Sequence, residues 1–490
     1  MIRTLLSHSL VYGLTTIAAR GALLVSLLVL PAILAPADYG ALAMLALVGN
    51  LAAVVVPLQV GQGLARHYGA ARGEAEKRLY ASSAWWFSVF AQLSFLALGQ
   101  VFAQRATVWV LGDGAYVPAV RIALVVMVLN SLFFFLQSQF RWAFRPRDFV
   151  IASLTYSFLT LGLSVGFALL WPVPLLGVLA GQAAGAAAGV LWAIWRLRDN
   201  ILARPHRPAL REMLAFAAPL VPAALAVALI SYSARIVLND LGSLADVGVF
   251  ALASQIASIA TLAIVGLQAA MTPLVTVHHA DPSTPRALGR VFQAFCAAAF
   301  VICLMLGLFA SEAIGWLDNP EYARAGPLVL LMAPAVLLVE MYIFAPGFWI
   351  SKRTGLQAAL STLSAAFAFA AAYLLIGAFD LSGAALASLA SGLFFFISWW
   401  MVSRRFYFVP VAWVRLLLFL LAGAAAGAGA LQWTEPGTAA GVAAKLVVIA
   451  FVALLAVVSG LVPWREGVVA AASHLRRGSP ASPTSGPDRR

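Results

Sequence analysis

Arg20 is the one formal charge within residues 7–34, an apolar stretch long enough to cross a bilayer. With about 1.5 Å of rise per helical residue, Arg20 would lie near the midplane of a hydrocarbon core about 30 Å thick. A guanidinium that faces lipid at that depth costs at least about 3 kcal/mol, so we expect Arg20 to face the protein interior or a water-filled cavity. Thr16, Gly13 and Ser9 precede Arg20 at helical spacing and form one face with it. This face is small and polar, as is typical of a helix surface that contacts neighbouring helices.

A second arginine stands among amides on the apolar stretch 39–65. Gln59, Gln62 and Arg66 are spaced i, i+3 and i+7, so a continuous helix would place them on one face that leads to the cytoplasm. We therefore predict that all three residues contact substrate.

A third arginine lies near the predicted outer end of helix 211–237. Arg235 follows Ser231 by one helical turn, and Pro219 with Pro222 should bend the same helix. Arginine suits a diphosphate, because its planar fork forms paired charge-assisted hydrogen bonds and stays protonated. The structural alternative is that Arg66 and Arg235 are ordinary interfacial arginines.

The next predicted helix, 247–275, carries a polar stripe along most of its length, formed by Ser254, Ser258, Thr261, Gln268 and Thr272. We predict that Ser258 and Gln268 bind substrate, although such stripes often only hold helices together.

Glu340 is the only acid that the sequence places well inside the bilayer. It lies between Pro334 and Pro346, and its counterparts in the repeat described below, 132–134, are apolar. We predict that Glu340 binds a coupling proton or sodium ion. A neutral buried acid and a structural partner of an arginine are the alternatives.

The composition indicates a polytopic membrane protein. The 490 residues are 63% hydrophobic and 10% charged, with a mean hydropathy of +0.95. Apolar runs predict fourteen helices, at about 8–34, 39–65, 80–103, 118–142, 149–171, 175–196, 211–237, 247–275, 289–312, 327–350, 355–378, 381–402, 411–432 and 439–462. Arg20 interrupts the first of these runs, so we do not expect a cleaved signal peptide.

Basic residues alternate between the connections. One set of connections holds 25 of the 31 Lys and Arg residues, and the other set, which includes Arg235 and Lys445, holds five. The positive-inside rule makes the first set cytoplasmic, so both termini are expected in the cytoplasm. The net charge of +13 is thus a topological signal, and no nucleic-acid partner is expected.

The chain repeats itself at an offset of 206 to 208 residues. Asp38-Tyr39-Gly40 corresponds to Asp246-Val247-Gly248, Tyr116 to Tyr322, and Gly177 to Gly383. Six helices per repeat return the chain to its starting side, so the halves should be parallel. The expected organisation is an N-lobe at 1–208, a C-lobe at 209–408, two further helices at 409–465 and a disordered cytoplasmic tail at 466–490.

The sequence lacks the usual signatures of an enzyme. No connection is long enough for a soluble catalytic domain, and there is no Walker A or HExxH motif. We therefore expect a transporter without catalytic residues, metal or cofactor.

The chain resembles the polysaccharide transporter branch of the multidrug/oligosaccharidyl-lipid/polysaccharide (MOP) exporter superfamily. The residues that carry the resemblance are Arg20 and the segments PADYGALAML, RWAFRPRDF, AFAAPLVPAALAVALISYSARIVL and NPEYARAGPLVLLMAP. Members of this branch often have an Asp-Arg pair near the end of helix 7, whereas here Ala234 precedes Arg235.

The resemblance implies two six-helix lobes around a central cavity lined by helices 1, 2, 7 and 8. It also implies a flippase for an undecaprenyl-diphosphate-linked oligosaccharide, with the bilayer, a polysaccharide polymerase and assembly proteins as partners. A multidrug or cation-coupled exporter of the same fold is the alternative, and a glycan polymerase or glycosyltransferase is a further one. A drug or cation exporter should prefer acids in its cavity, and a polymerase should need a long outer loop.

Overall fold

The protein is all-α in the computed structural model, as the hydropathy predicts, and the described residues contain no strand. Twelve helices among them are long and apolar enough to cross a membrane. The structure describes residues 25–26, 29–201, 203–264, 267–268, 271, 275, 279–317, 319–351, 353–433 and 437–462. Arg20 and most of the first predicted helix lie outside them.

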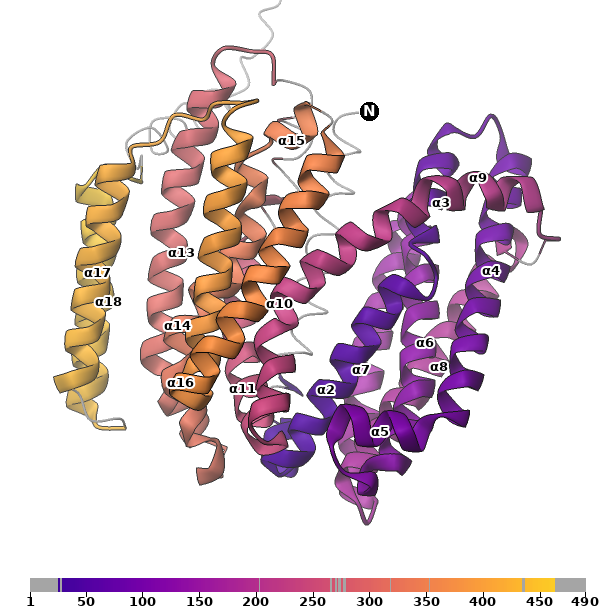
Figure 1. The fold of residues 1–490 in the computed structure, drawn as a ribbon, viewed down its shortest axis with the longest axis horizontal. Coiled ribbons are helices and arrows are strands. Elements are labelled where there is room, and N and C mark those ends of the chain that lie inside the picture. Colours follow the sequence, from indigo (N-terminus) through magenta and orange to yellow (C-terminus); the bar gives the residue numbers. More distant parts are fainter. Residues whose placement is uncertain are drawn as a thin grey trace, which may run out of the picture.

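Two helical bundles stand side by side (Figure 1). The first bundle consists of α2 (Pro36–Val55), α3 (Val60–Ala70), α4 (Glu74–Val101), α5 (Ala103–Leu111), α6 (Val117–Trp142), α7 (Pro146–Leu170) and α8 (Pro174–Ile201). The second bundle consists of α10 (Val221–Leu241), α11 (Leu244–Ser258), α13 (Thr284–Gly315), α14 (Gly326–Glu340), α15 (Gly347–Ile350) and α16 (Thr354–Ser403). Outside the second bundle lie α17 (Trp413–Trp433) and α18 (Ala439–Val458).

The 50-residue helix α16 is a hairpin rather than one rod. Its backbone leaves helical geometry at Asp380, and the rings of Phe367 and Phe394 stack at 4.1 Å, which requires the chain to fold back. The two arms of α16 match the predicted helices 355–378 and 381–402. The count of twelve therefore includes two predicted helices in one, and most of the first predicted helix lies outside the described residues.

Related glycines occupy related places in the two bundles. A Cβ at Gly177 would lie 2.4 Å from the carbonyl oxygen of Phe167, and one at Gly383 would lie 2.0 Å from that of Leu375. Each glycine thus permits the close approach of two antiparallel helical arms.

The bundles touch where α2 crosses α11. A Cβ on Gly40 would lie 1.9 Å from the carbonyl oxygen of Leu244, and a Cβ on Gly248 would lie 1.9 Å from that of Pro36. These two glycines are counterparts in the repeat, so the two halves of the chain meet backbone to backbone at equivalent positions.

One bent segment joins the two bundles. Helix α9 (Arg207–Ala217) packs on α3 and α4, whereas α10 packs mainly on α16. Between them, Ala218–Leu220 form a turn of 3₁₀ helix at the predicted bend. The same connection is seen as the slanted helix between the bundles (Figure 1).

A buried ion pair fastens α18 to the second bundle. The ammonium of Lys445 contacts the carboxylate of Glu312 on α13 and donates to the carbonyl oxygen of Leu308 at 2.8 Å. Lys445 is 2% exposed and the Glu312 side chain 13%. The charge pattern predicted that Lys445 belongs to the outer connections and that Glu340 is the only acid well inside the bilayer. Glu312 is a second acid buried within a candidate span.

Candidate functional site

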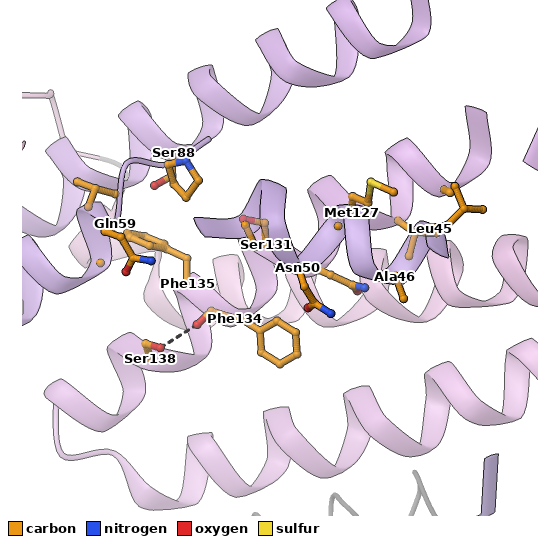
Figure 2. A pocket seen from close by; sticks show the side chains of 18 of the residues that line it. Leu45, Ala46, Asn50, Gln59, Ser88, Met127, Ser131, Phe134, Phe135 and Ser138 are labelled. Carbon is orange, nitrogen blue, oxygen red and sulfur yellow. Dashed lines mark hydrogen bonds between the residues drawn. The ribbon is translucent and has the colours of Figure 1, made fainter. Parts of the chain in front are cut away.

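A polar cavity lies inside the first bundle, and we call it the first-bundle cavity. Its volume is about 390 Å³, and α2, α3, α4 and α6 supply most of its wall. Its polar lining residues are Asn50, Gln59, Ser88, Asn130, Ser131 and Ser138. Figure 2 shows the side chains of Asn50, Gln59, Ser131, Phe134 and Phe135 around this space. The resemblance implied a cavity lined by helices 1, 2, 7 and 8, but of these only helix 2 lines this one in the described residues.

A break in the predicted helix 39–65 shapes one wall of the cavity. Helix α2 ends at Val55 and α3 begins at Val60. Between them Pro57 has no N–H to donate, and Leu58 and Gln59 adopt left-handed φ angles of 47° and 54°. Non-glycine residues in this region are strained by about 1–3 kcal/mol each, and such strain clusters at ligand sites. The expected continuous helix was therefore wrong at this point.

The break separates the three residues predicted to share one face. Gln59 lines the cavity from the residue before α3, whereas Gln62 is exposed. Arg66 is also exposed and lies over the ring of Phe216, 4.3 Å from its centroid, so it packs against α9. Of the three, the structure places only Gln59 at the cavity.

Arg235 lies where α10 approaches α2. Its Nε is buried and has no hydrogen-bond partner among the described residues. The guanidinium lies 5.9 Å from the ring centroid of Tyr232, and it interacts electrostatically with the hydroxyls of Tyr232 and Tyr39. No carboxylate of the described residues takes part in these interactions. This agrees with the sequence, in which Ala234 stands where members of the polysaccharide transporter branch often have an Asp.

Tyr232 connects Arg235 to the cavity. The Asn50 amide, which lines the cavity, donates to the Tyr232 hydroxyl at 3.0 Å across the boundary between the bundles. Ser231, which the helical spacing places one turn from Arg235, is exposed. The helical position of Tyr232, three residues before Arg235, could have indicated this neighbour.

The structure brings together two residues predicted to have different roles. Gln268 donates its side-chain amide to the Glu340 carboxylate at 3.3 Å. Glu340 ends α14, about two thirds of the way along the candidate span Pro320–Ile350. Ser258, at the end of α11, donates instead to the carbonyl oxygen of Gln255 at 2.7 Å.

Sequence reasoning missed Asn50, Asn130 and Ser131, which line the cavity. The signal was present, because Asn50 and Asn130 interrupt strongly apolar helices, and buried polar groups in such helices need partners. Three or more His, Cys, Asp or Glu side chains placed to hold a metal ion are not found in the described part of the chain.

The comparisons with known proteins agree with this architecture. The family described as "Polysaccharide biosynthesis protein" matches residues 5–279, more than half of the chain. No protein of curated function matches the sequence.

Several solved structures share the fold. Lipid II flippase MurJ in an inward closed conformation superposes with a TM-score of 0.66 at 11% identity, covering 94% of this chain and all of that one. An inward-facing multidrug resistance MATE transporter of the MOP superfamily gives 0.63 at 15% identity, covering 79% of this chain and 95% of that one. An outward-facing MATE transporter gives 0.54 at 16% identity, covering 82% and 94%.

Proposed function

This chain belongs to the polysaccharide biosynthesis protein family, and on that premise we propose that it flips an undecaprenyl-diphosphate-linked oligosaccharide across the bacterial inner membrane. The MOP transporter fold supports movement by alternating access between two bundles. The substrate would serve the synthesis of a surface or exported polysaccharide.

The observation that carries the proposal is the state of Arg235. Arg235 is half-buried with a buried Nε, and a guanidinium withdrawn from water in this way normally has a carboxylate partner, because desolvation of a lone charge is costly. Here the Nε is unpaired among the described residues, and the nearby groups are tyrosines. A diphosphate would supply the missing negative charge and accept paired hydrogen bonds from the guanidinium. Arg20, outside the described residues, would act as a second cation toward the same group.

Glu340 and Gln268 support ion coupling in the second bundle. A proton or sodium ion can drive transport only if it binds one conformation better than the other. The Glu340 carboxylate, held by the Gln268 amide, is a group whose proton or cation affinity would change when α14 moves. We propose this pair as the coupling site.

A flipping assay with purified protein tests the proposal. Proteoliposomes would carry the lipid-linked saccharide that accumulates in cells lacking this chain, labelled on its glycan. Arg235→Ala should slow the transfer of the lipid-linked saccharide between leaflets by at least about tenfold, because a charge-assisted pair contributes about 1.5–3 kcal/mol. Arg235→Lys should be intermediate, since lysine keeps the charge but not the fork.

The matched control is Arg105→Ala, which removes an exposed arginine of α5 and should flip at the wild-type rate. The flippase proposal fails if wild-type protein leaves the lipid-linked saccharide in its original leaflet. Export of small organic cations by the same vesicles would then favour the multidrug exporter.

A further inference from the structure

The first-bundle cavity is polar but uncharged. Among the described residues, its wall includes three side-chain amides and three hydroxyls, and no Asp, Glu, Lys, Arg or His. Its volume of about 390 Å³ falls within the range of about 300–1,000 Å³ that is common for small-molecule sites. Any ligand that fills it must therefore satisfy neutral hydrogen-bonding groups.

The hydrogen bonds of the lining residues leave both donors and acceptors for a ligand. Tyr156 donates to Oδ1 of Asn130 at 2.7 Å, so the Asn130 N–H groups remain as donors. Gln92 donates to the Ser131 hydroxyl oxygen at 2.6 Å, so the Ser131 O–H can donate to a ligand. The Asn50 amide donates an N–H to the Tyr232 hydroxyl, so its carbonyl oxygen remains as an acceptor.

Gln59 adds an amide that forms no side-chain hydrogen bond among the described residues, and the strained break before α3 holds it at the cavity. A sugar hydroxyl both donates and accepts, and an acetamido group does the same through its N–H and C=O. Sugar rings therefore match this mixture of partners better than an apolar drug or an anion would.

Two aromatic rings complete the wall. Phe134 and Phe135 line the cavity on α6, and Phe134 is 51% exposed although its helix is apolar. The face of an aromatic ring carries partial negative charge, which attracts the polarised C–H groups on the flat side of a pyranose.

The cavity is next to the cation proposed to hold the diphosphate. Asn50 lines the cavity, its amide contacts Tyr232 at 3.0 Å, and Arg235 lies 5.9 Å from the Tyr232 ring. In a lipid-linked saccharide the first sugar is bonded directly to the diphosphate. A sugar subsite must therefore adjoin the anion subsite, and this cavity does.

We propose that the first-bundle cavity is the subsite for the sugar bonded to the diphosphate, and that it takes an uncharged hexose or N-acetylhexosamine. This inference rests on the proposed flippase function. An acidic sugar would lose its hydration in the cavity and find no cationic side chain in the wall, so it should be rejected.

Binding measurements in nanodiscs with the full chain test the inference. The probes are undecaprenyl diphosphate, undecaprenyl diphosphate N-acetylglucosamine and undecaprenyl diphosphate glucuronic acid. Wild-type protein should bind the N-acetylglucosamine lipid at least about tenfold more tightly than the sugar-free lipid, and the glucuronic acid lipid no more tightly than the sugar-free one.

Two variants locate the preference. Gln59→Met and Asn130→Leu keep side-chain size and remove hydrogen bonds, so each should weaken binding of the N-acetylglucosamine lipid about three- to tenfold. Neither should alter binding of undecaprenyl diphosphate. The control Gln104→Met changes an exposed amide on α5 and should bind all three lipids like wild type.

The outcomes separate the two proposals. Equal binding of all three lipids by wild type would overturn the sugar subsite and leave the flippase intact. A variant that weakens sugar-bearing and sugar-free lipids alike would assign its residue to the diphosphate or to folding, and would also overturn the subsite. Failure of wild type to bind any of the three lipids would overturn the proposed function and the subsite with it.

Discussion

Gln268 and Glu340, 72 residues apart in the chain, are joined by an amide-to-carboxylate hydrogen bond of 3.3 Å. The Gln268 amide also lies 3.5 Å from the Glu340 carbonyl oxygen, so it contacts both the side chain and the end of α14. Glu340 forms no ion pair among the described residues, which do not include Arg20.

We predict that Glu340→Gln uncouples transport from an ion gradient. In liposomes with an imposed pH or sodium gradient, this variant should flip at the rate that wild type shows without a gradient. Its affinity for substrate should stay within about twofold of wild type, because Glu340 does not line the first-bundle cavity and its side chain is held by Gln268. The exposed residue Glu321 provides the control variant Glu321→Gln. Full gradient stimulation of Glu340→Gln would return Glu340 to a structural role.

The crossing of α2 and α11 should tolerate no side chain. In Gly40→Ala the added Cβ would lie only 1.9 Å from the carbonyl oxygen of Leu244, so the two helices must separate. We expect a loss of about 1–3 kcal/mol in the free energy of unfolding, measured as a lower melting temperature in detergent.

Gly162→Ala is the matched control for that variant. A Cβ on Gly162 meets nothing within 4 Å, and alanine favours helix by about 1 kcal/mol, so this variant should melt at or above the wild-type temperature. An unchanged melting temperature for Gly40→Ala would mean that the contact between the bundles is not tight.

Removal of Lys445 should be costly because it strands a buried acid. Lys445→Met leaves Glu312 without its cation, and breaking such a pair costs about 3–5 kcal/mol. The double change Lys445→Met with Glu312→Leu should recover most of the lost melting temperature. Lys77→Met, which breaks an exposed pair with Glu74, should cost less than about 1 kcal/mol. Equal losses in both single variants would argue against a buried pair.

Arg20 stays a prediction from the sequence. Arg20→Ala should abolish glycan export while the protein reaches the membrane at a normal level, and Arg20→Lys should restore export only in part. Export in cells and membrane abundance by immunoblot would be measured together. Disappearance of Arg20→Ala from the membrane would show that Arg20 supports folding instead.

The orientation can be tested with reporter fusions. Fusions after Arg72, Arg204 and Arg405 should report the cytoplasm, whereas fusions near Asp113 and Glu435 should report the periplasm. The connections α3–α4 and α8–α9 lie at one end of the first bundle and α5 at the other, as this topology requires (Figure 1). Two or more reversed reporters would refute it.

Hydropathy predicted the helices well, because crossing a hydrocarbon core requires about 20 apolar residues whatever the tertiary structure. The range 118–142 became α6 (Val117–Trp142), and the gap between 378 and 381 became the turn of α16 at Asp380. The repeat likewise predicted the correspondence of Gly40 with Gly248, although their direct contact appears only in the fold.

The rest depended on contacts distant in sequence. The left-handed backbone at Leu58 and Gln59 has no glycine to signal it, so a continuous helix was expected. The hydrogen bond between Asn50 and Tyr232 spans 182 residues, and no periodicity within one helix can predict it. Lys445 has no visible partner in the sequence, so it was expected among the outer connections. In the fold the carboxylate of Glu312 compensates for the desolvation of the Lys445 ammonium.

The pair between Lys445 and Glu312 also sets a condition on biosynthesis. The two residues are 133 positions apart, so α13 enters the membrane well before α18 has been made. At a synthesis rate of about 5–20 residues per second, Glu312 waits on the order of ten seconds for its cation. During that interval the carboxylate must be protonated or remain at the membrane surface. Full insertion of α13 before α18 has been made therefore requires a neutral Glu312, and an ionised Glu312 has to wait for the last two helices.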